Sequence, residues 1–153
     1  MKLIDTVMEA SKGLNMLEKS IVIATIAHAG EVDKGGNPYI LHPLAVASRV
    51  ETIEEKIVAH LHDVVEDTTI TLQNLRDVGF AEEIVDAVDA MTRRDEETYM
   101  EFINRAAEND KARNNKIADI QENMDLSRIP KPSEEDYSRA SRYIRALSVL
   151  EKH

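Results

Sequence analysis

The stretch LHDVVEDT, residues 61–68, places one histidine, two aspartates and one glutamate in a run that is otherwise mostly apolar. On a helix, which we predict over residues 54–67, one continuous apolar stripe consists of Ile57, Val58, Leu61, Val64 and Val65. The opposite face carries His62, Asp63, Glu66 and Asp67. Residues four apart are neighbours on a helix, so the three carboxylates repel one another unless a cation or a proton lies among them. This face is therefore either a solvated polar surface or a metal-binding surface.

Signals for helix starts recur along the chain. A capping residue is followed three positions later by an acid at Asn15, Thr52, Thr98 and Ser133. The chain has only 5 glycines and 4 prolines, and no alternation of period two persists long enough to indicate a strand. We predict helices at residues 2–12, 16–30, 43–51, 54–67, 71–78, 81–91, 98–108, 111–126 and 134–151. The predicted fold class is all-α, a helical bundle, and we expect residues 1–153 to form a single domain.

Composition restricts the function further. The formal net charge of −10 repels nucleic acid and anionic membranes, and a bound cation would help such a chain to hold an anionic substrate. There is no cysteine, no run of 18 apolar residues, and no signal-peptide core in residues 1–12. We therefore expect a cytoplasmic protein that binds neither nucleic acid nor a membrane, and the oligomeric state stays open.

A metal site on the 54–67 helix needs ligands from elsewhere in the chain. The nitrogen of His62 and the oxygens of Asp63 suit Mn²⁺, Fe²⁺ or Zn²⁺ better than Ca²⁺. His42 enters a helix beside Pro43, where the backbone holds it firmly, although a structural role near the helix cap is an alternative. For the remaining histidines, structural or terminal positions are favoured: His28, His60 and His153.

A further acid lies in the predicted 111–126 helix. Asp119 stands between apolar neighbours, and Asn123 follows one turn later on the same side. This position predicts a carboxylate directed toward the protein rather than toward solvent. The alternative is a carboxylate at the rim that pairs with Lys116.

Four stretches occur in an order that resembles the HD-domain metal phosphohydrolases, and among them the hydrolase domain of RelA/SpoT-type (p)ppGpp enzymes. They are AHAG (27–30), DKGGNPYILHPLAVA (33–47), AHLHDVVEDTTIT (59–71) and KIADIQENMDLSRI (116–129). The resemblance implies an all-helical HD-domain bundle and a metal that is usually Mn²⁺. It implies metal ligands at His42, His62, Asp63 and Asp119, a catalytic acidic pair at Glu66 and Asp67, and nucleotide contacts at Lys34 and Asn123.

The implied activity is metal-dependent hydrolysis of a small phosphorylated nucleotide, with (p)ppGpp losing its 3′-pyrophosphate. Three departures affect the guanine site: Asp33 replaces an arginine, Gln121-Glu122 replaces a Leu-His pair, and Leu126 replaces a hydroxyl residue. These departures leave open a nucleoside monophosphate or the 2′-phosphate of NADPH as the substrate. A non-catalytic nucleotide-binding domain is a third reading, against which the intact acidic pair argues.

Overall fold

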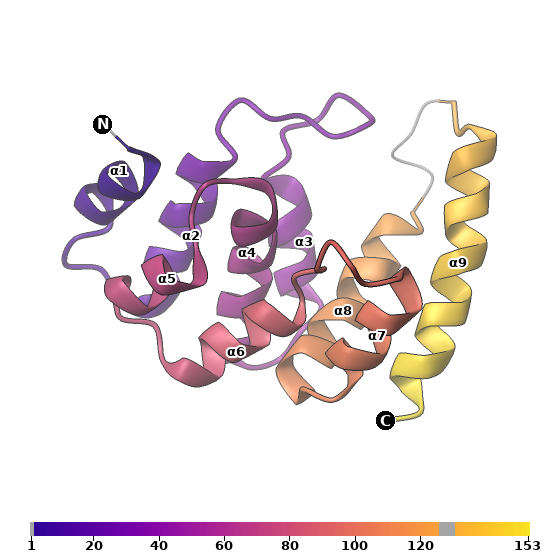
Figure 1. The fold of residues 1–153 in the computed structure, drawn as a ribbon. Coiled ribbons are helices and arrows are strands. Elements are labelled where there is room, and N and C mark those ends of the chain that lie inside the picture. Colours follow the sequence, from indigo (N-terminus) through magenta and orange to yellow (C-terminus); the bar gives the residue numbers. More distant parts are fainter. Residues whose placement is uncertain (1, 126–130) are drawn as a thin grey trace.

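The fold is known from a computed structural model, which describes residues 2–125 and 131–153. Within these ranges the chain forms helices and no strand, with one isolated bridge between Val32 and Pro38 (Figure 1). The helices are α1 (Leu3–Ala10), α2 (Met16–Ala27), α3 (Leu41–Ser48), α4 (Ile53–Asp67), α5 (Leu72–Val78), α6 (Glu82–Ala90), α7 (Tyr99–Ala107), α8 (Asp110–Asn123) and α9 (Glu134–Glu151). The predicted all-α class is confirmed.

Each of the four predicted helix starts is a capping box, in which the cap side chain and the acid three residues later bond each other's backbone amides. The ends of the helices differ more from the prediction. Helix α2 stops at Ala27 instead of residue 30, because Gly30 adopts a φ of 82° that no helix continues. Helix α3 begins at Leu41, two residues earlier than predicted. The predicted end of the 111–126 helix, at Leu126, lies outside the described residues.

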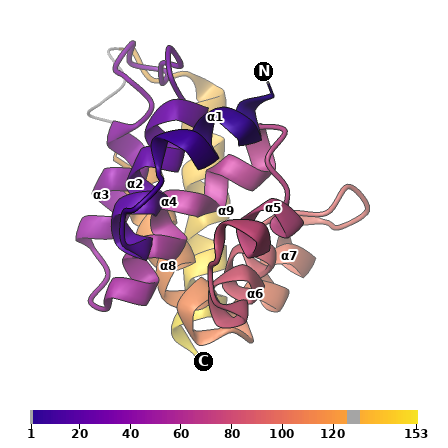
Figure 2. The ribbon, with the colours of Figure 1, turned by 90° about the vertical axis from the view of Figure 1, so that its left-hand side faces the viewer.

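Helix α4 lies at the centre of the molecule and packs against α2, α3, α6 and α8 (Figures 1 and 2). All residues from Ile57 to Val64 are buried, including the polar ones. The face that carries His62 and Asp63 is therefore covered by protein. On this face, Glu66 and Asp67 at the end of the helix are exposed to solvent.

Three groups of apolar side chains hold the helices together. One lies mainly among α2, α4, α5 and α6, and a second joins α7 and α8 to α9. The third is small and joins α3, α4 and α8 through Val46, Val50 and the alanines Ala47, Ala59 and Ala118. Alanine side chains let these three helices approach closely, which brings polar residues of the same three helices near one another. Among the described residues no helix has the length and apolar character needed to cross a membrane.

Candidate metal centre and substrate pocket

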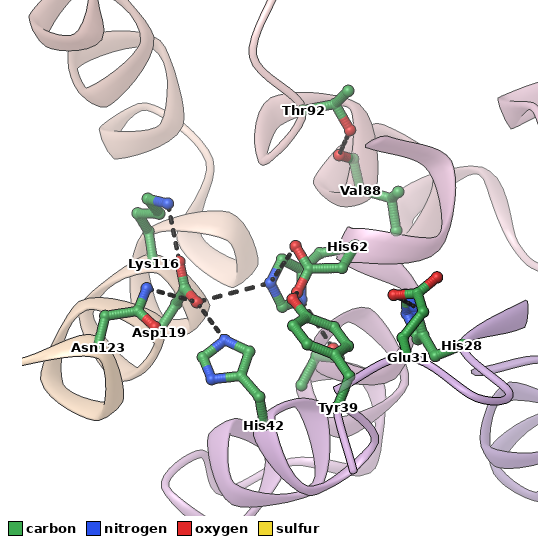
Figure 3. Close-up of polar contacts among 12 residues, drawn as sticks. His28, Glu31, Tyr39, His42, His62, Val88, Thr92, Lys116, Asp119 and Asn123 are labelled. Carbon is green, nitrogen blue, oxygen red and sulfur yellow. Dashed lines mark hydrogen bonds and ion pairs between the residues drawn. The ribbon is translucent and has the colours of Figure 1, made fainter. Parts of the chain in front are cut away.

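Three polar side chains from three different helices meet near the middle of the molecule (Figure 3). His42 lies in the first turn of α3, His62 in α4 and Asp119 in α8. One ligand atom from each lies within 4.8 Å of the others, so a single ion could contact all three. The Nε2 atom of His42 is 2.7 Å from Asp119 Oδ1, and the Nε2 atom of His62 is 3.7 Å from the same oxygen.

The hydrogen bonds of His62 suit a metal ligand. Its Nδ1 atom lies 2.8 Å from the carbonyl oxygen of Ala59, which can only accept, so Nδ1 carries the proton. With a cation bound in place of a proton, the Nε2 atom would offer its lone pair, the arrangement found in metal-bound histidines. This Nε2 atom is buried and has no hydrogen-bond partner. A buried nitrogen in this state is what a metal site requires, and the residues present therefore fit a divalent cation.

Asp63, the fourth predicted ligand, lies beside this group. Its Oδ1 atom is 3.2 Å from His62 Nε2, and its Oδ2 atom accepts a hydrogen bond of 2.5 Å from the Tyr39 hydroxyl. The tyrosine fixes the orientation of the carboxylate, in the way that neighbours of metal ligands commonly do. Nothing in the sequence pattern indicated a role for Tyr39, because it belongs to the loop before α3 and reaches α4 only in the folded chain.

Asp119 uses its two oxygens differently. Oδ1 faces the two histidines and lies 3.4 Å from Asn123 Nδ2, while Oδ2 accepts a 2.8 Å bond from Lys116 Nζ. Both arrangements considered from the sequence are therefore present at once. The carboxylate pairs with Lys116, yet it is buried and directed into the centre rather than lying at the rim.

In this centre the interactions between charged groups outweigh the effect of burial on the pKa values. Burial alone would raise the pKa of Asp119, but the Lys116 ammonium and the two histidines hold it well below its usual range. Burial likewise acts against the charged form of Asp63, whose pKa is nevertheless lowered to about 2, chiefly by His62. For His62, the charges of Asp63 and Asp119 outweigh burial and raise the pKa. The centre therefore has a strong preference for positive charge among its carboxylates.

A cavity of about 500 Å³ opens beside the three ligands. Its walls include both predicted nucleotide contacts, Lys34 and Asn123, together with Asp33 of the same loop. The Asp33 carboxylate accepts 2.9 Å bonds from the backbone amides of Gly35 and Asn37, so it shapes the loop that carries Lys34. The amide at Asn123 donates to Asp119 and thus connects the cavity wall to the metal centre.

Helix α9 supplies one side of the cavity, which sequence reasoning missed. Asp136, Arg139 and Tyr143 all line it. Lys34 donates a 2.8 Å hydrogen bond to Asp136, linking the loop before α3 to the first turn of α9. No local pattern could have indicated this contact, because 102 residues separate the two side chains.

The predicted catalytic pair lies one turn beyond the ligands of α4. Glu66 and Asp67 are exposed at the end of the helix, and neither lines the cavity. Partial desolvation by neighbouring protein atoms, followed by the charge of Asp63, raises the pKa of both carboxyls. Their catalytic role stays a prediction.

The remaining histidines lie outside the group of ligands. His60 is buried on another side of α4 and is hydrogen-bonded to Ser20 Oγ at 3.0 Å, the packed role expected from the sequence. His28 caps α2 and lies 3.3 Å from Glu31, and its other ring nitrogen is buried without a hydrogen-bond partner. His153 contacts the backbone of α9 at the exposed end of the chain.

Comparison with known proteins agrees with the family resemblance of the sequence. The model of the HD domain family matches residues 20–127. A probable GTP pyrophosphokinase from Mycobacterium leprae is 32% identical over 135 residues, which cover 80% of this chain and 17% of the relative. A guanosine-3′,5′-bis(diphosphate) 3′-pyrophosphohydrolase from Vibrio cholerae is 34% identical over 100 residues, 63% of this chain and 14% of the relative. Its Haemophilus influenzae counterpart is 38% identical over 78 residues, 48% of this chain and 11% of the relative.

The chain therefore spans less than a fifth of the length of these relatives. The family match, in contrast, covers more than two thirds of the chain and contains three of the four stretches that carry the sequence resemblance, together with residues 116–127 of the fourth. It also contains the helices that bring His42, His62 and Asp119 together. The chain belongs to the HD domain family.

Proposed function

We propose that this chain is a Mn²⁺-dependent phosphohydrolase whose substrate is (p)ppGpp. Water would cleave the bond between the ribose 3′ oxygen and the pyrophosphate, and the products would be pyrophosphate and GDP or GTP. Relatives named as guanosine-3′,5′-bis(diphosphate) 3′-pyrophosphohydrolases support this choice of substrate. That the whole of residues 1–153 forms one domain stays a prediction.

The observation that carries the proposal is the convergence of His42, His62 and Asp119 beside a cavity whose walls include both predicted nucleotide contacts. Two imidazole nitrogens and carboxylate oxygens suit a divalent transition metal. A cation bound there would make a water molecule more acidic and offset the negative charge of the phosphoryl group. Lys34, Lys116 and Arg139 line the adjacent cavity together with six carboxylate side chains, so a bound cation would supply the positive charge that an anionic nucleotide needs there.

We assign the remaining roles in metal binding, nucleotide binding and catalysis to individual side chains. We assign Asp63 to the ligand set, with Tyr39 holding its orientation. Lys34 and Asn123 would hold the nucleotide. Glu66 or Asp67 would orient the attacking water or accept its proton, since a raised pKa makes a carboxylate a stronger base near neutral pH.

The test is to incubate purified protein with Mn²⁺ and ppGpp and to measure pyrophosphate and GDP. The proposal predicts both products in equal amounts, and their loss on chelation. No turnover by metal-loaded, folded protein would contradict the choice of substrate. Release of phosphate or pyrophosphate from another nucleotide would retain the phosphohydrolase activity and change the substrate.

A second candidate is hydrolysis of a nucleoside monophosphate or of the 2′-phosphate of NADPH. Asp33 favours it, because its carboxylate is bound to two backbone amides and cannot stack on a guanine as an arginine does. A panel of phosphorylated nucleotides separates the two candidates, since these substrates release phosphate and ppGpp releases pyrophosphate. A purely nucleotide-binding domain predicts no product from any member of the panel.

A further inference from the structure

Lys34, which we assign to nucleotide binding, already forms an ion pair with a carboxylate of the protein itself. The ammonium of Lys34, in the loop before α3, lies 2.8 Å from Asp136 Oδ1 in the first turn of α9. The lysine side chain is 51% exposed, whereas that of Asp136 is 6% exposed. Both residues line the cavity beside the metal centre. The contact therefore lies where substrate would enter rather than on a distant surface.

Asp136 forms contacts with the start of its own helix as well as with the loop before α3. Its Oδ1 atom also lies 3.4 Å from Arg139 Nη1, so two cations from separate elements face one oxygen. Its Oδ2 atom accepts bonds from the backbone amide of Ser133, at 2.8 Å, and from the Ser133 hydroxyl, at 3.0 Å. Lys34 and the Ser133 amide hold the pKa of Asp136 at about 2, so the carboxylate stays ionised at neutral pH. An oxyanion bound by lysine, arginine and a helix N-terminus uses the same donors that bind a phosphate group.

We propose that Asp136 controls the affinity for nucleotides by competing with the phosphate groups of the substrate for Lys34. This proposal rests on the proposed function to the extent that Lys34 contacts the nucleotide. Any incoming phosphate must displace a carboxylate from the lysine, and must also approach a fixed negative charge. The contact therefore lowers the affinity for any nucleotide whose phosphate must take the place of the carboxylate on Lys34.

The effect on nucleotide affinity depends on the fraction of molecules in which Lys34 is free of Asp136. If the lysine is free of Asp136 only part of the time, the apparent dissociation constant of a nucleotide rises by the inverse of that fraction. Removal of the Asp136 charge should therefore tighten binding rather than weaken it. A residue that only caps α9 would produce no such gain.

The experiment is calorimetric titration of the Mn²⁺-loaded protein with GDP and with GMP. Asp136→Asn removes the charge while its amide oxygen can still accept from Ser133. We expect it to bind both GDP and GMP more tightly, each by roughly 3–10-fold. The matched control is Glu135→Gln, which changes the net charge equally, one residue away on α9. Its side chain is 87% exposed and reaches Arg139 only at 4.0 Å, so we expect its affinities to stay within two-fold of wild type.

Two further variants isolate the contact. On a Lys34→Ala background, Asp136→Asn should give a clearly smaller gain, because the carboxylate then no longer competes with the phosphate for the lysine. Ser133→Ala weakens the same helix cap but leaves the ion pair, so it separates loss of the cap from loss of the charge. Helix content measured by circular dichroism shows that each variant is folded.

The proposal is overturned if Asp136→Asn binds GDP no more tightly than Glu135→Gln does, or if its gain is undiminished without Lys34. It is also overturned if no variant binds either nucleotide. Because binding is measured without turnover, the failure of the proposed function is a separate result. A protein that gains GDP affinity as expected but releases no pyrophosphate from ppGpp contradicts the assigned reaction alone.

Discussion

Two histidines of α4, His60 and His62, are both buried but lie on different sides of the helix, with different hydrogen-bond partners and opposite shifts in pKa. On the side that meets α2, His60 is hydrogen-bonded to Ser20, and burial, followed by the charge of Lys56, lowers its pKa to about 4. On the side that meets α3 and α8, the buried His62 faces Asp63 and Asp119, whose charges raise its pKa.

The difference teaches that burial of a histidine does not by itself indicate a metal ligand. What distinguishes His62 is a nitrogen left without a hydrogen-bond partner and directed at carboxylates from two helices. The ring of His60 forms a hydrogen bond with Ser20, and no carboxylate of the described residues lies within salt-bridge distance of it. We therefore expect damage on the His62 side to affect metal binding and reaction, and damage on the His60 side to affect stability.

The largest effect is expected from Asp119→Asn. This change removes the carboxylate that faces both histidines and leaves the buried Lys116 ammonium without its partner. Hydrolytic activity should fall by more than the roughly 10–100-fold that loss of a supporting residue costs, and bound metal should be lost. The control is Asp110→Asn in the first turn of the same helix, where the side chain is 85% exposed. An active, metal-loaded Asp119→Asn variant would contradict the assigned centre.

Glu66→Gln tests whether the end of α4 takes part in the reaction. If Glu66 accepts the proton of the attacking water, turnover should fall by about 10²–10⁴-fold while bound metal is retained. Glu54→Gln, at the exposed start of the same helix, should leave turnover unchanged. The role falls to Asp67 or to neither residue if Glu66→Gln turns over like wild type.

The same variant yields a pH dependence. The pKa of Glu66 is raised, and a base acts in its ionised form, so wild-type activity should decline as the pH falls through this raised pKa. The decline should begin at a higher pH than an ordinary glutamate would produce. Residual activity of Glu66→Gln should lack this part of the profile, which is measured as turnover against pH at saturating metal. An unchanged profile would remove Glu66 as the base.

A smaller effect is expected from Tyr39→Phe, which removes only the hydroxyl bonded to Asp63. Metal affinity should fall by about 10-fold, because neighbours of a ligand set its orientation. Tyr137→Phe on α9, where the ring is 57% exposed, is the matched control. Equal metal affinities in the two variants, measured by competition with a chelating dye, would show that Tyr39 does not position Asp63.

The smallest effect on the reaction is expected on the His60 side of α4. His60→Gln should lower the free energy of unfolding by about 1–3 kcal/mol, since it disturbs a buried hydrogen bond. Turnover per folded molecule should stay within two-fold of wild type. Denaturant unfolding and an activity assay below the transition together check both statements. A large loss of turnover in a folded variant would erase the contrast between the two sides.

Most of the helical framework could be predicted from the sequence because its signals are local. The capping pairs at Asn15, Thr52, Thr98 and Ser133 each begin a helix at the expected place. The ends were less predictable. Helix α2 stops where a glycine adopts positive φ, and apolar periodicity alone does not show which residue will do so.

The candidate site was predictable to the extent that it lies on helices. The wheel of α4 placed His62 and Asp63 together, and the structure brings three of the four predicted ligands within 4.8 Å. The roles of Tyr39 and Asp136 were not predicted. Tyr39 contacts Asp63 only when the loop before α3 folds against α4, and Asp136 contacts Lys34 only when α9 folds against that loop. The wheel also treated one face of α4 as uniform, whereas packing buries His62 and leaves Glu66 exposed.

The most direct test of the account is the metal content of His62→Gln and His60→Gln, purified in parallel with wild type and measured by elemental analysis after loading with Mn²⁺ and removal of the excess. The account predicts about one ion per chain in wild type and in His60→Gln, and none in His62→Gln. Equal metal content in the two variants would contradict the claim that one side of α4 carries the metal centre.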